Sequence, residues 1–172
     1  ETVKLARRFR SRGVVGVDLA GDESRFPAKP HYPAFDMAKK YSIPATVHAG
    51  EVRDAAGVRE AVERLGAVRI GHGIRSIDDG RVLDLLRRRN VTLEVCPTSN
   101  VQICVAESLA AHPLKRLADA GIRVTVNSDD PAVSNITLSH EYSVAVRDCG
   151  LSAAQMARAV RCALDVNVSI HV

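Results

Sequence analysis

Residues 43–51 decide the fold, and they read Ile43-Pro44-Ala45-Thr46-Val47-His48-Ala49-Gly50-Glu51. The run before His48 predicts a β-strand, and this strand presents an imidazole, two small residues and a carboxylate. Histidine is a common metal ligand and a general base near neutral pH, and Glu51 on the turn after the strand can face the same pocket. A lone His–Glu pair is more often a structural ion pair than a reactive one, so the surrounding sequence must decide between the two interpretations.

Four further strand-like runs accompany this one, and each ends in turn-forming residues. The five predicted strands are residues 14–19, 43–47, 68–73, 91–96 and 122–127. The strand ends recur regularly, since 24 positions separate His48 from His72 and again His72 from Cys96. Such a rhythm is typical of βα units in a parallel sheet. The sequence therefore predicts a single α/β domain of about five βα units.

Helical patterns occupy most segments between the strands. Apolar residues at helical spacing predict helices over residues 1–12, 34–41, 58–65, 77–89, 113–120 and 138–149, and a last helix that begins at Ser152. Ser152 and Gln155 have the spacing of a capping box. A long polar loop is expected after Pro97, and residues 167–172 show no clear amphipathic pattern.

The composition is that of a globular domain with an aliphatic core. The chain has 172 residues, of which 46% are hydrophobic and 26% are charged, and this balance argues against disorder. It contains no Trp, three Tyr and three Phe, so the core must consist of Val, Leu, Ile and Ala. The net charge is +4. The Arg clusters, such as Arg87–Arg89, lie in helical stretches without interleaved aromatic residues, which favours a solvated helix surface over a nucleic-acid site.

The cysteines and the apolar runs bear on the compartment. Cys96, Cys104, Cys149 and Cys162 show no close pairing, which favours a reduced, cytoplasmic protein. No apolar run approaches the length of a membrane span, so no membrane partner is expected. The sequence opens at Glu1 within a helical pattern, and we therefore expect it to begin partway through a larger protein.

Polar residues follow all five predicted strands. The candidates are Gly21 with Asp22, His48 with Glu51, His72, Ser99 with Asn100, and Asp129 with Asp130. The carboxyl ends of parallel strands share one edge of the sheet, and this edge carries function in such folds. We therefore expect these side chains to face one site. Two histidines and two adjacent aspartates on successive strand ends indicate a reactive or metal-binding site.

The adjacent Asp129 and Asp130 favour a metal. Two like charges at a buried strand end repel each other and lose hydration, and a divalent cation or a protonated partner would relieve both costs. The alternative is that Asp130-Pro131 starts a turn and that Asp129 caps the next helix. His and Asp ligands together suit zinc or a similar cation. The remaining histidines are expected at the surface or in the tail: His31, His112, His140 and His171.

The strand ends resemble those of the adenosine deaminase family. The matching motifs are VDLAGDE (17–23), TVHAGE (46–51), RIGHG (69–73), EVCPTSN (94–100) and VNSDDP (126–131), and HPLKRL (112–117) and HEYSVA (140–145) are similar to bacterial members. The resemblance implies a (β/α)8 barrel of the TIM type within the amidohydrolase group, with one catalytic zinc. Residues 1–172 would then form a partial barrel domain of about five βα units, without the first three.

The resemblance also implies roles for individual residues. His48 and Asp129 would be zinc ligands. Glu51 would donate a proton to N1 of the purine, and this role requires a raised pKa. His72 would not bind zinc but would lie beside the attacking water and help to deprotonate and orient it. Asp129 would also accept a hydrogen bond from the activated water.

Two more residues would contact the purine ring in this comparison. Asp130 would bind N7, and the backbone N–H of Gly21 would meet N3. The implied reaction is the hydrolytic deamination of adenosine or deoxyadenosine to inosine and ammonia in purine salvage, with a purine nucleoside as the small-molecule partner. Adenine or a modified adenosine is an alternative substrate, because the residues that recognise ribose would lie largely outside this sequence.

One departure from the family bears on activity. The family carries an H-x-H pair that supplies two more zinc ligands, and no H-x-H occurs in these 172 residues. A catalytic zinc site normally has three protein ligands, so we expect the chain alone to be inactive. A non-catalytic remnant that folds partially is one alternative. A flavodoxin-like nucleotide-binding domain is another, although no Gly-rich phosphate loop follows the first strand.

Overall fold

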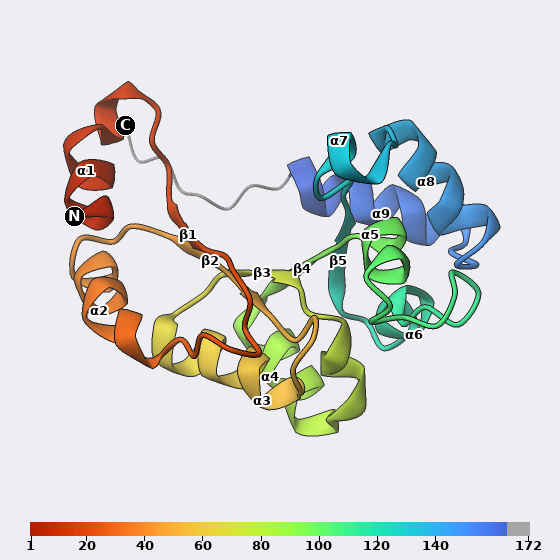
Figure 1. Ribbon diagram of the computed structural model, residues 1–172, viewed down its shortest axis with the longest axis horizontal. Coiled ribbons are helices and arrows are strands. Elements are labelled where there is room, and N and C mark those ends of the chain that lie inside the picture. The colour runs from red at the N-terminus through yellow and green to blue at the C-terminus, as the bar shows by residue number, and fades with distance from the viewer. Residues whose placement is uncertain (165–172) are drawn as a thin grey trace.

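Five parallel strands form the centre of the molecule (Figure 1). The computed structural model describes residues 1–164, so the expectation for residues 167–172 lies outside the described part. The strands are β1 (Val17–Leu19), β2 (Ala45–Ala49), β3 (Arg69–His72), β4 (Thr92–Val95) and β5 (Arg123–Val126).

The strands lie side by side in chain order, β1-β2-β3-β4-β5. Sequential parallel order is that of a barrel wall, and it agrees with the predicted α/β barrel type. A flavodoxin-like sheet places its second strand outside the first, so the strand order excludes that alternative. Figure 1 shows the strands as an open arc and not as a closed ring.

Helices and single turns connect consecutive strands. The α-helices are α1 (Thr2–Arg8), α2 (Tyr32–Lys40), α3 (Ala55–Glu60), α4 (Gly80–Arg89), α5 (Pro97–Gln102), α6 (Leu114–Asp119), α7 (Pro131–Ser134), α8 (Leu138–Arg147) and α9 (Ala153–Leu164). The shorter turns are η1 (Arg10–Arg12), η2 (Lys29–His31), η3 (Ala61–Leu65) and η4 (Ile74–Asp78). In Figure 1, α2, α3 and α4 follow one side of the arc, and α5, α6, α8 and α9 gather around β5.

Alternation along β2 separates its core side from its open side. Ala45, Val47 and Ala49 are buried, whereas Thr46 and His48 are half-buried. Successive side chains of a strand point to opposite faces of the sheet. Val47 belongs to the same core cluster as Val58 of α3, so the alternation turns His48 away from that helical layer.

The core is aliphatic, as the composition predicts. The largest fully buried side chains include Leu65, Ile70, Ile74, Leu86, Leu93, Leu114 and Leu117. A smaller cluster of Val3, Ala6, Ala38 and Ile43 packs α1 against α2. Full burial of such a side chain contributes about 1.5–3 kcal/mol to stability, so the helical layer holds the strands in place.

Local sequence signals place several helix ends correctly. The helical region that begins with α1 ends at Gly13 and the region that begins with α3 ends at Gly66, and both glycines adopt left-handed backbone angles. The predicted capping box is confirmed. The N–H of Ser152 donates to Oε1 of Gln155 at 2.9 Å, and the N–H of Gln155 donates to Oγ of Ser152 at 3.2 Å.

The prediction of a long polar loop after Pro97 is partly wrong. Helix α5 begins at Pro97 itself. The first position of a helix needs no backbone N–H, so a proline fits there. Helix α7 likewise starts at Pro131, immediately after a strand exit. Both helices are too short to show an apolar period in the sequence.

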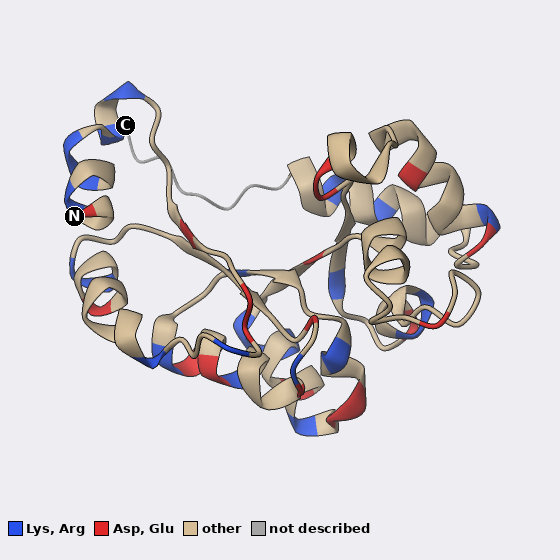
Figure 2. Ribbon diagram, viewed as in Figure 1, with Lys and Arg blue, Asp and Glu red and all other residues tan. Residues whose placement is uncertain are grey.

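Charged residues lie mainly on the helices (Figure 2). Arg87, Arg88 and Arg89 occupy the last turn of α4, where positive charge complements the helix dipole. This placement agrees with the predicted solvated helix surface. The four cysteines are free thiols. None of the helices in the described part of the chain has the length and apolar character needed to cross a bilayer.

Candidate active site

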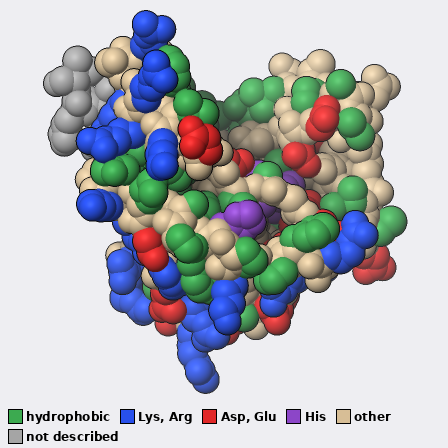
Figure 3. Space-filling view, turned by 60° about the vertical axis from the view of Figure 1, so that its left-hand side comes forward, with side chains coloured by type: hydrophobic (Ala, Val, Ile, Leu, Met, Phe, Trp, Pro, Cys, Tyr) green, Lys and Arg blue, Asp and Glu red, His purple; other side chains and the backbone are tan. Residues whose placement is uncertain are grey.

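One face of the molecule is hollowed, and histidine atoms are visible within the hollow (Figure 3). His48 lies near the end of β2, and His72 is the last residue of β3. Their rings meet edge to face, with centroids 5.3 Å apart and planes at 62°. One ligand atom from each of His72, Cys96 and Asp129 lies within 4.8 Å of the other two. The fold therefore brings three predicted site residues, His48, His72 and Asp129, to one place.

His48 has room for its ring because its neighbour in the sheet is a glycine. Gly71 pairs with His48 in the register of β2 and β3, and a Cβ on Gly71 would lie 2.8 Å from Cγ of His48. Nδ1 of His48 lies 3.4 Å from Oδ1 of Asp18 on β1, an ion-pair contact without hydrogen-bond geometry. The carboxylate of Asp18 raises the pKa of His48 against the effect of burial.

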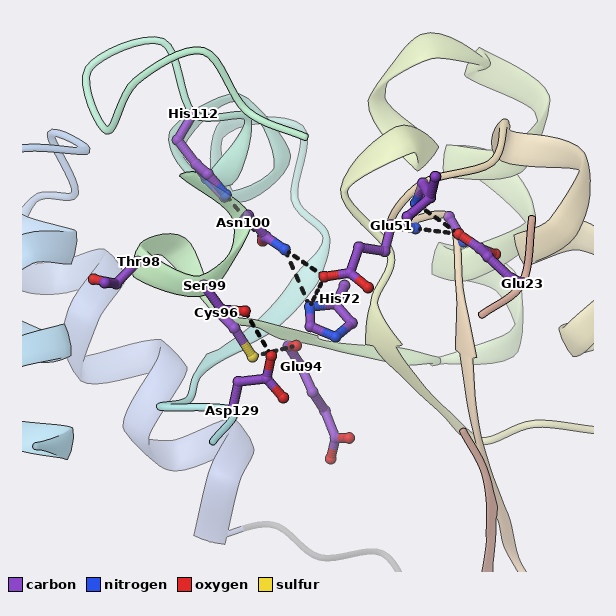
Figure 4. A network of polar contacts seen from close by, with 12 residues as sticks. Glu23, Glu51, His72, Glu94, Cys96, Thr98, Ser99, Asn100, His112 and Asp129 are labelled. Atoms are coloured by element: carbon purple, nitrogen blue, oxygen red, sulfur yellow. Dashed lines mark hydrogen bonds and ion pairs between the residues drawn. The ribbon is translucent and has the colours of Figure 1, made fainter. Parts of the chain in front are cut away.

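Glu51 lies on the turn after β2, within a polar cluster (Figure 4). Its Oε1 accepts a hydrogen bond from Nδ2 of Asn100 at 3.0 Å and lies 3.2 Å from Nδ1 of His72. Burial, followed by the charge of Asp129, raises the pKa of Glu51 to about 7. At neutral pH this carboxyl group is therefore partly protonated, which is the state that the predicted proton donor needs.

His72 is buried, with 3% of its surface exposed. Burial lowers its pKa and so favours the neutral ring. Its φ is 59°, and that of Asp129 is 57°, so both residues have left-handed backbone angles. Such angles are costly for residues with a side chain, and they cluster at functional sites.

The two aspartates after β5 differ from the expectation in two ways. Both are exposed, so the predicted burial of this pair is wrong. Asp130, and not Asp129, caps the next helix, because its Oδ1 accepts from the N–H groups of Ala132 at 3.1 Å and Val133 at 3.2 Å. Asp129 instead accepts a hydrogen bond from Oγ of Ser99 at 2.7 Å. This bond orients the Asp129 carboxylate at the rim.

Gly21 lies in the exposed turn after β1 and has a φ of 143°. A Cβ at this position would meet no atom within 4 Å. The backbone conformation at this position therefore favours a glycine, whereas crowding by neighbouring atoms does not require one. Gly21 lies at the same rim as the other predicted residues, since β1 pairs in parallel with β2.

Glu23 has a structural role that the sequence reasoning did not assign. Its carboxylate accepts hydrogen bonds from four consecutive backbone N–H groups, those of Gly50, Glu51, Val52 and Arg53, at 2.7–2.9 Å. These bonds fix the turn that presents Glu51. The signal in the sequence was the acidic end of VDLAGDE, but its partners lie 27 or more positions away.

Asn100 and His112 form the inner side of the same site. Asn100 is fully buried, and His112 is 3% exposed. The prediction that His112 lies at the surface is therefore wrong, whereas His31 and His140 are exposed as expected. His112 is buried because α6 follows it directly and packs Leu114 and Leu117 into the core.

The donor chemistry suits the predicted metal in part. An imidazole from His48 and a carboxylate from Asp129 are ligand types that zinc accepts. Cys96 also approaches Asp129, but burial raises the pKa of its thiol and disfavours the thiolate that would bind a metal. The described residues thus offer the two ligands that the resemblance implies, with Asp18 placed to orient His48.

Comparison with known proteins identifies the family of this chain. The family model described as adenosine deaminase matches residues 1–168. The chain belongs to the adenosine deaminase family. The family places it among hydrolases. Among curated relatives, the adenosine deaminase of Erwinia tasmaniensis is 43% identical over 144 residues, which are 84% of this chain and 43% of that protein.

Other family members act on related purines. The adenine deaminase of Rhizobium meliloti is 39% identical over 164 residues, which are 95% of this deaminase-family chain and 51% of that protein. The N6-methyl-AMP deaminase of Arabidopsis thaliana has a TM-score of 0.85 at 31% identity, with 98% of this chain and 49% of that chain covered. The chain thus spans about half the length of the curated relatives it matches.

A more distant structure shares the fold alone. An amidohydrolase from Burkholderia ambifaria, determined with bound Zn, has a TM-score of 0.83 at 20% identity, and the match covers 95% of this chain and 47% of that chain. The parallel sheet of this adenosine deaminase family member therefore corresponds to about half of a larger α/β enzyme fold.

Proposed function

We propose that this chain supplies the acid, the water-orienting histidine and two metal ligands of an enzyme that removes the 6-amino group of adenosine by hydrolysis. Residues 1–172 would form about five of the eight βα units of its barrel. The observation that carries the proposal is the position of Glu51, whose Oε1 lies 3.2 Å from Nδ1 of the buried His72 in surroundings that raise the pKa of the Glu51 carboxyl to about 7.

Each predicted residue has a task in this reaction. Glu51 donates its proton to N1 of the purine, which makes C6 more electrophilic. His72 lies beside the attacking water and orients it, and Asp129 accepts a hydrogen bond from that water. Because N7 of a purine accepts hydrogen bonds, Asp130 would bind it through an O–H on its second carboxyl oxygen, since Oδ1 caps α7. The N–H of Gly21 meets N3.

His48 and Asp129 are the residues that would hold a zinc ion. When bound, zinc would supply the Lewis acidity that makes water a nucleophile at neutral pH. Asp18 supports this arrangement by its contact with Nδ1 of His48, which leaves Nε2 for the metal. The remaining ligands would come from an H-x-H pair outside this sequence.

Adenosine is the proposed substrate, and adenine and N6-methyl-AMP are the competing ones. Relatives that act on each of these purines match the chain. The groups at this rim address only the purine ring and the water, so they do not distinguish ribose or phosphate. A non-catalytic remnant is the alternative for the chain alone.

A chimeric enzyme tests the proposal. The chain is joined to the part of the Erwinia tasmaniensis adenosine deaminase that lies outside the matched region, and the protein is loaded with zinc. We expect deamination of adenosine, measured as loss of absorbance at the adenosine maximum, and weaker activity on adenine and N6-methyl-AMP. A folded, zinc-loaded chimera that acts on none of the three would contradict the proposal.

A further inference from the structure

A buried chain of hydrogen bonds runs from α6 to the site (Figure 4). The backbone N–H of Leu114 donates to Nδ1 of His112 at 3.1 Å. Nε2 of His112 lies 3.2 Å from Oδ1 of Asn100. Nδ2 of Asn100 lies 3.0 Å from Oε1 of Glu51 and 3.2 Å from Nδ1 of His72. Asn100 therefore joins both predicted catalytic side chains to a histidine that touches neither.

The polarity of this chain is fixed at its far end. A backbone N–H can only donate, so Nδ1 of His112 must accept and carries no proton. A neutral imidazole has its single proton on the other nitrogen, so Nε2 of His112 donates to Oδ1 of Asn100. Burial lowers the pKa of His112 to about 4, so the neutral ring dominates at neutral pH.

The orientation of the Asn100 amide follows from this donor. Its oxygen must face His112, and its two N–H groups must then face Glu51 and His72. The reversed amide would set an N–H of Asn100 against the N–H of His112. It would leave a buried donor without an acceptor, and such a group is costly in a protein interior.

The same logic reaches the ring of His72. Its Nδ1 accepts from Asn100, so the proton of the neutral ring lies on Nε2. A nitrogen that carries a proton can donate to an oxygen but cannot bind a metal ion. The tautomer therefore fits a histidine that orients water, and it disfavours His72 as a ligand despite its short distance to Asp129.

We propose that His112 and Asn100 are positioning residues: His112 fixes the orientation of the Asn100 amide, and Asn100 holds the carboxyl of Glu51 and the tautomer of His72. The catalytic consequence rests on the proposed deaminase function, whereas the polarity of the network does not. Neither residue touches the substrate in this proposal.

Nitrogen NMR of the 15N-labelled chain tests the polarity directly, because two-bond 1H–15N couplings distinguish the two histidine tautomers. At pH 7 we expect both His112 and His72 to be neutral with the proton on Nε2. A proton on Nδ1 of His112, or a His112 that titrates near the ordinary value of 6.5, would overturn the proposal.

Two substitutions separate positioning from mere packing. His112→Gln keeps a donor for Asn100 and an acceptor for the N–H of Leu114, whereas His112→Leu removes both. We expect a mixture of His72 tautomers in the Leu variant and the single tautomer in the Gln variant. His140→Leu, at an exposed position on α8, is the matched control and should change nothing. A single His72 tautomer in a folded His112→Leu variant would contradict the proposal. If that variant does not fold, the tautomers measured in the unsubstituted chain decide the question.

The chimeric deaminase gives a kinetic reading. Since small misplacements of catalytic groups are costly, we expect His112→Leu to lower kcat by about tenfold or more with KM within about twofold, and His112→Gln to restore most of the rate. An unchanged kcat in His112→Leu would overturn the proposal. An inactive unsubstituted chimera would contradict the proposed function instead, and the tautomers would still test the network.

Discussion

Glu51 shows how its surroundings prepare a carboxyl group for acid chemistry. An ordinary glutamic acid is ionised at neutral pH and has no proton to give. Here burial and the nearby charge of Asp129 raise the pKa to about 7, although the bond from Asn100 acts in the opposite direction. The position just after β2 therefore favours the protonation state that the proposed reaction needs.

The first prediction concerns this proton. In the chimeric deaminase, Glu51→Gln keeps the size of the side chain but removes the acid, so kcat should fall by about 10²–10⁴-fold. His48 and Asp129 are unchanged, so the zinc content, measured by atomic absorption, should stay the same. Substantial turnover in the zinc-loaded variant would exclude Glu51 as the proton donor.

The second prediction concerns the dependence of stability on pH. The folded-state pKa of His112, about 4, lies below its ordinary value of 6.5. As the pH falls through this window, the unfolded chain takes up a proton on His112 more readily than the folded protein, so the free energy of unfolding decreases. Between pH 7 and pH 5 the loss is about 2 kcal/mol. Glu51 has the opposite sign, because its raised pKa adds stability as the pH falls.

A comparison of variants isolates the contribution of His112. The free energy of unfolding in urea is measured at pH 7 and pH 5 for the original chain and for His112→Gln. Both proteins contain Glu51, so its effect cancels in the comparison. The original chain should lose about 2 kcal/mol more than the variant. An equal loss in the two proteins would show that His112 titrates freely in the folded state.

The third prediction concerns the space beside His48. A methyl group at Gly71 would lie 2.8 Å from the His48 ring, so Gly71→Ala should lower the free energy of unfolding by about 1–3 kcal/mol and displace the ring. Gly80→Ala is the control, because a Cβ there meets no atom within 4 Å. Equal unfolding midpoints in urea for the two variants would contradict the close contact.

At the residue scale, the sequence was sufficient to predict the titratable side chains that follow the strands. His48, Glu51 and His72 were predicted from their positions at strand ends, and the structure places them together. His112 was assigned to the surface because its acceptor on Asn100 belongs to a helix that the sequence did not reveal. A buried partner of this kind has no local pattern, since its environment comes from packing.

At the element scale, the turn after β2 depends on a side chain from another loop. The carboxylate of Glu23 receives the four N–H groups from Gly50 to Arg53. Successive backbone N–H groups in a turn form a concave site that suits a carboxylate. The loop after β1 therefore controls the geometry after β2.

The fourth prediction follows from this contact. Glu23→Gln removes the charge and one of the two oxygens, so it should lower the free energy of unfolding by about 1–2 kcal/mol. The amide protons of residues 50–53 should then exchange faster with solvent, as measured by NMR. Glu63→Gln, an exposed change on the outer helical surface, should leave their exchange rates unchanged. Unaltered exchange in Glu23→Gln would contradict the role of the carboxylate.

Elements with a long apolar period were predictable, and short ones were not. The five strands and the capping box at Ser152 follow from local patterns. Helices α5 and α7 span six and four residues, which is too little for a helical period to emerge. Both helices start at a proline directly after a strand exit, and such a proline is interpreted from the sequence as the end of the strand and not as the start of a helix.

At the scale of the molecule, the proposed metal site is incomplete within the described residues. In the proposal His48 and Asp129 provide two ligand groups, whereas a catalytic zinc normally has at least three from the protein. The fifth prediction is that the 172-residue chain alone does not deaminate adenosine, even with added zinc. Loss of absorbance at the adenosine maximum that a zinc chelator abolishes would contradict it.

The fold class was predictable because the strand ends repeat at a regular interval. That rhythm indicates parallel βα units but leaves the strand order open, and a doubly wound sheet would show the same rhythm. The order is decided by packing between units that are distant in the sequence. Only the structure could therefore separate the barrel wall from the flavodoxin-like alternative.

The sequential strand order has a consequence for how the chain folds. Each strand from β1 to β4 pairs with the next strand along the chain, so each pairing closes a segment of only one βα unit. The entropy lost on closing a segment grows with its length, and contacts between near neighbours in sequence favour rapid folding. The sheet can thus grow one unit at a time, with each new strand adding to an edge that already exists. A ribosome releases the units in the same order in which they pair.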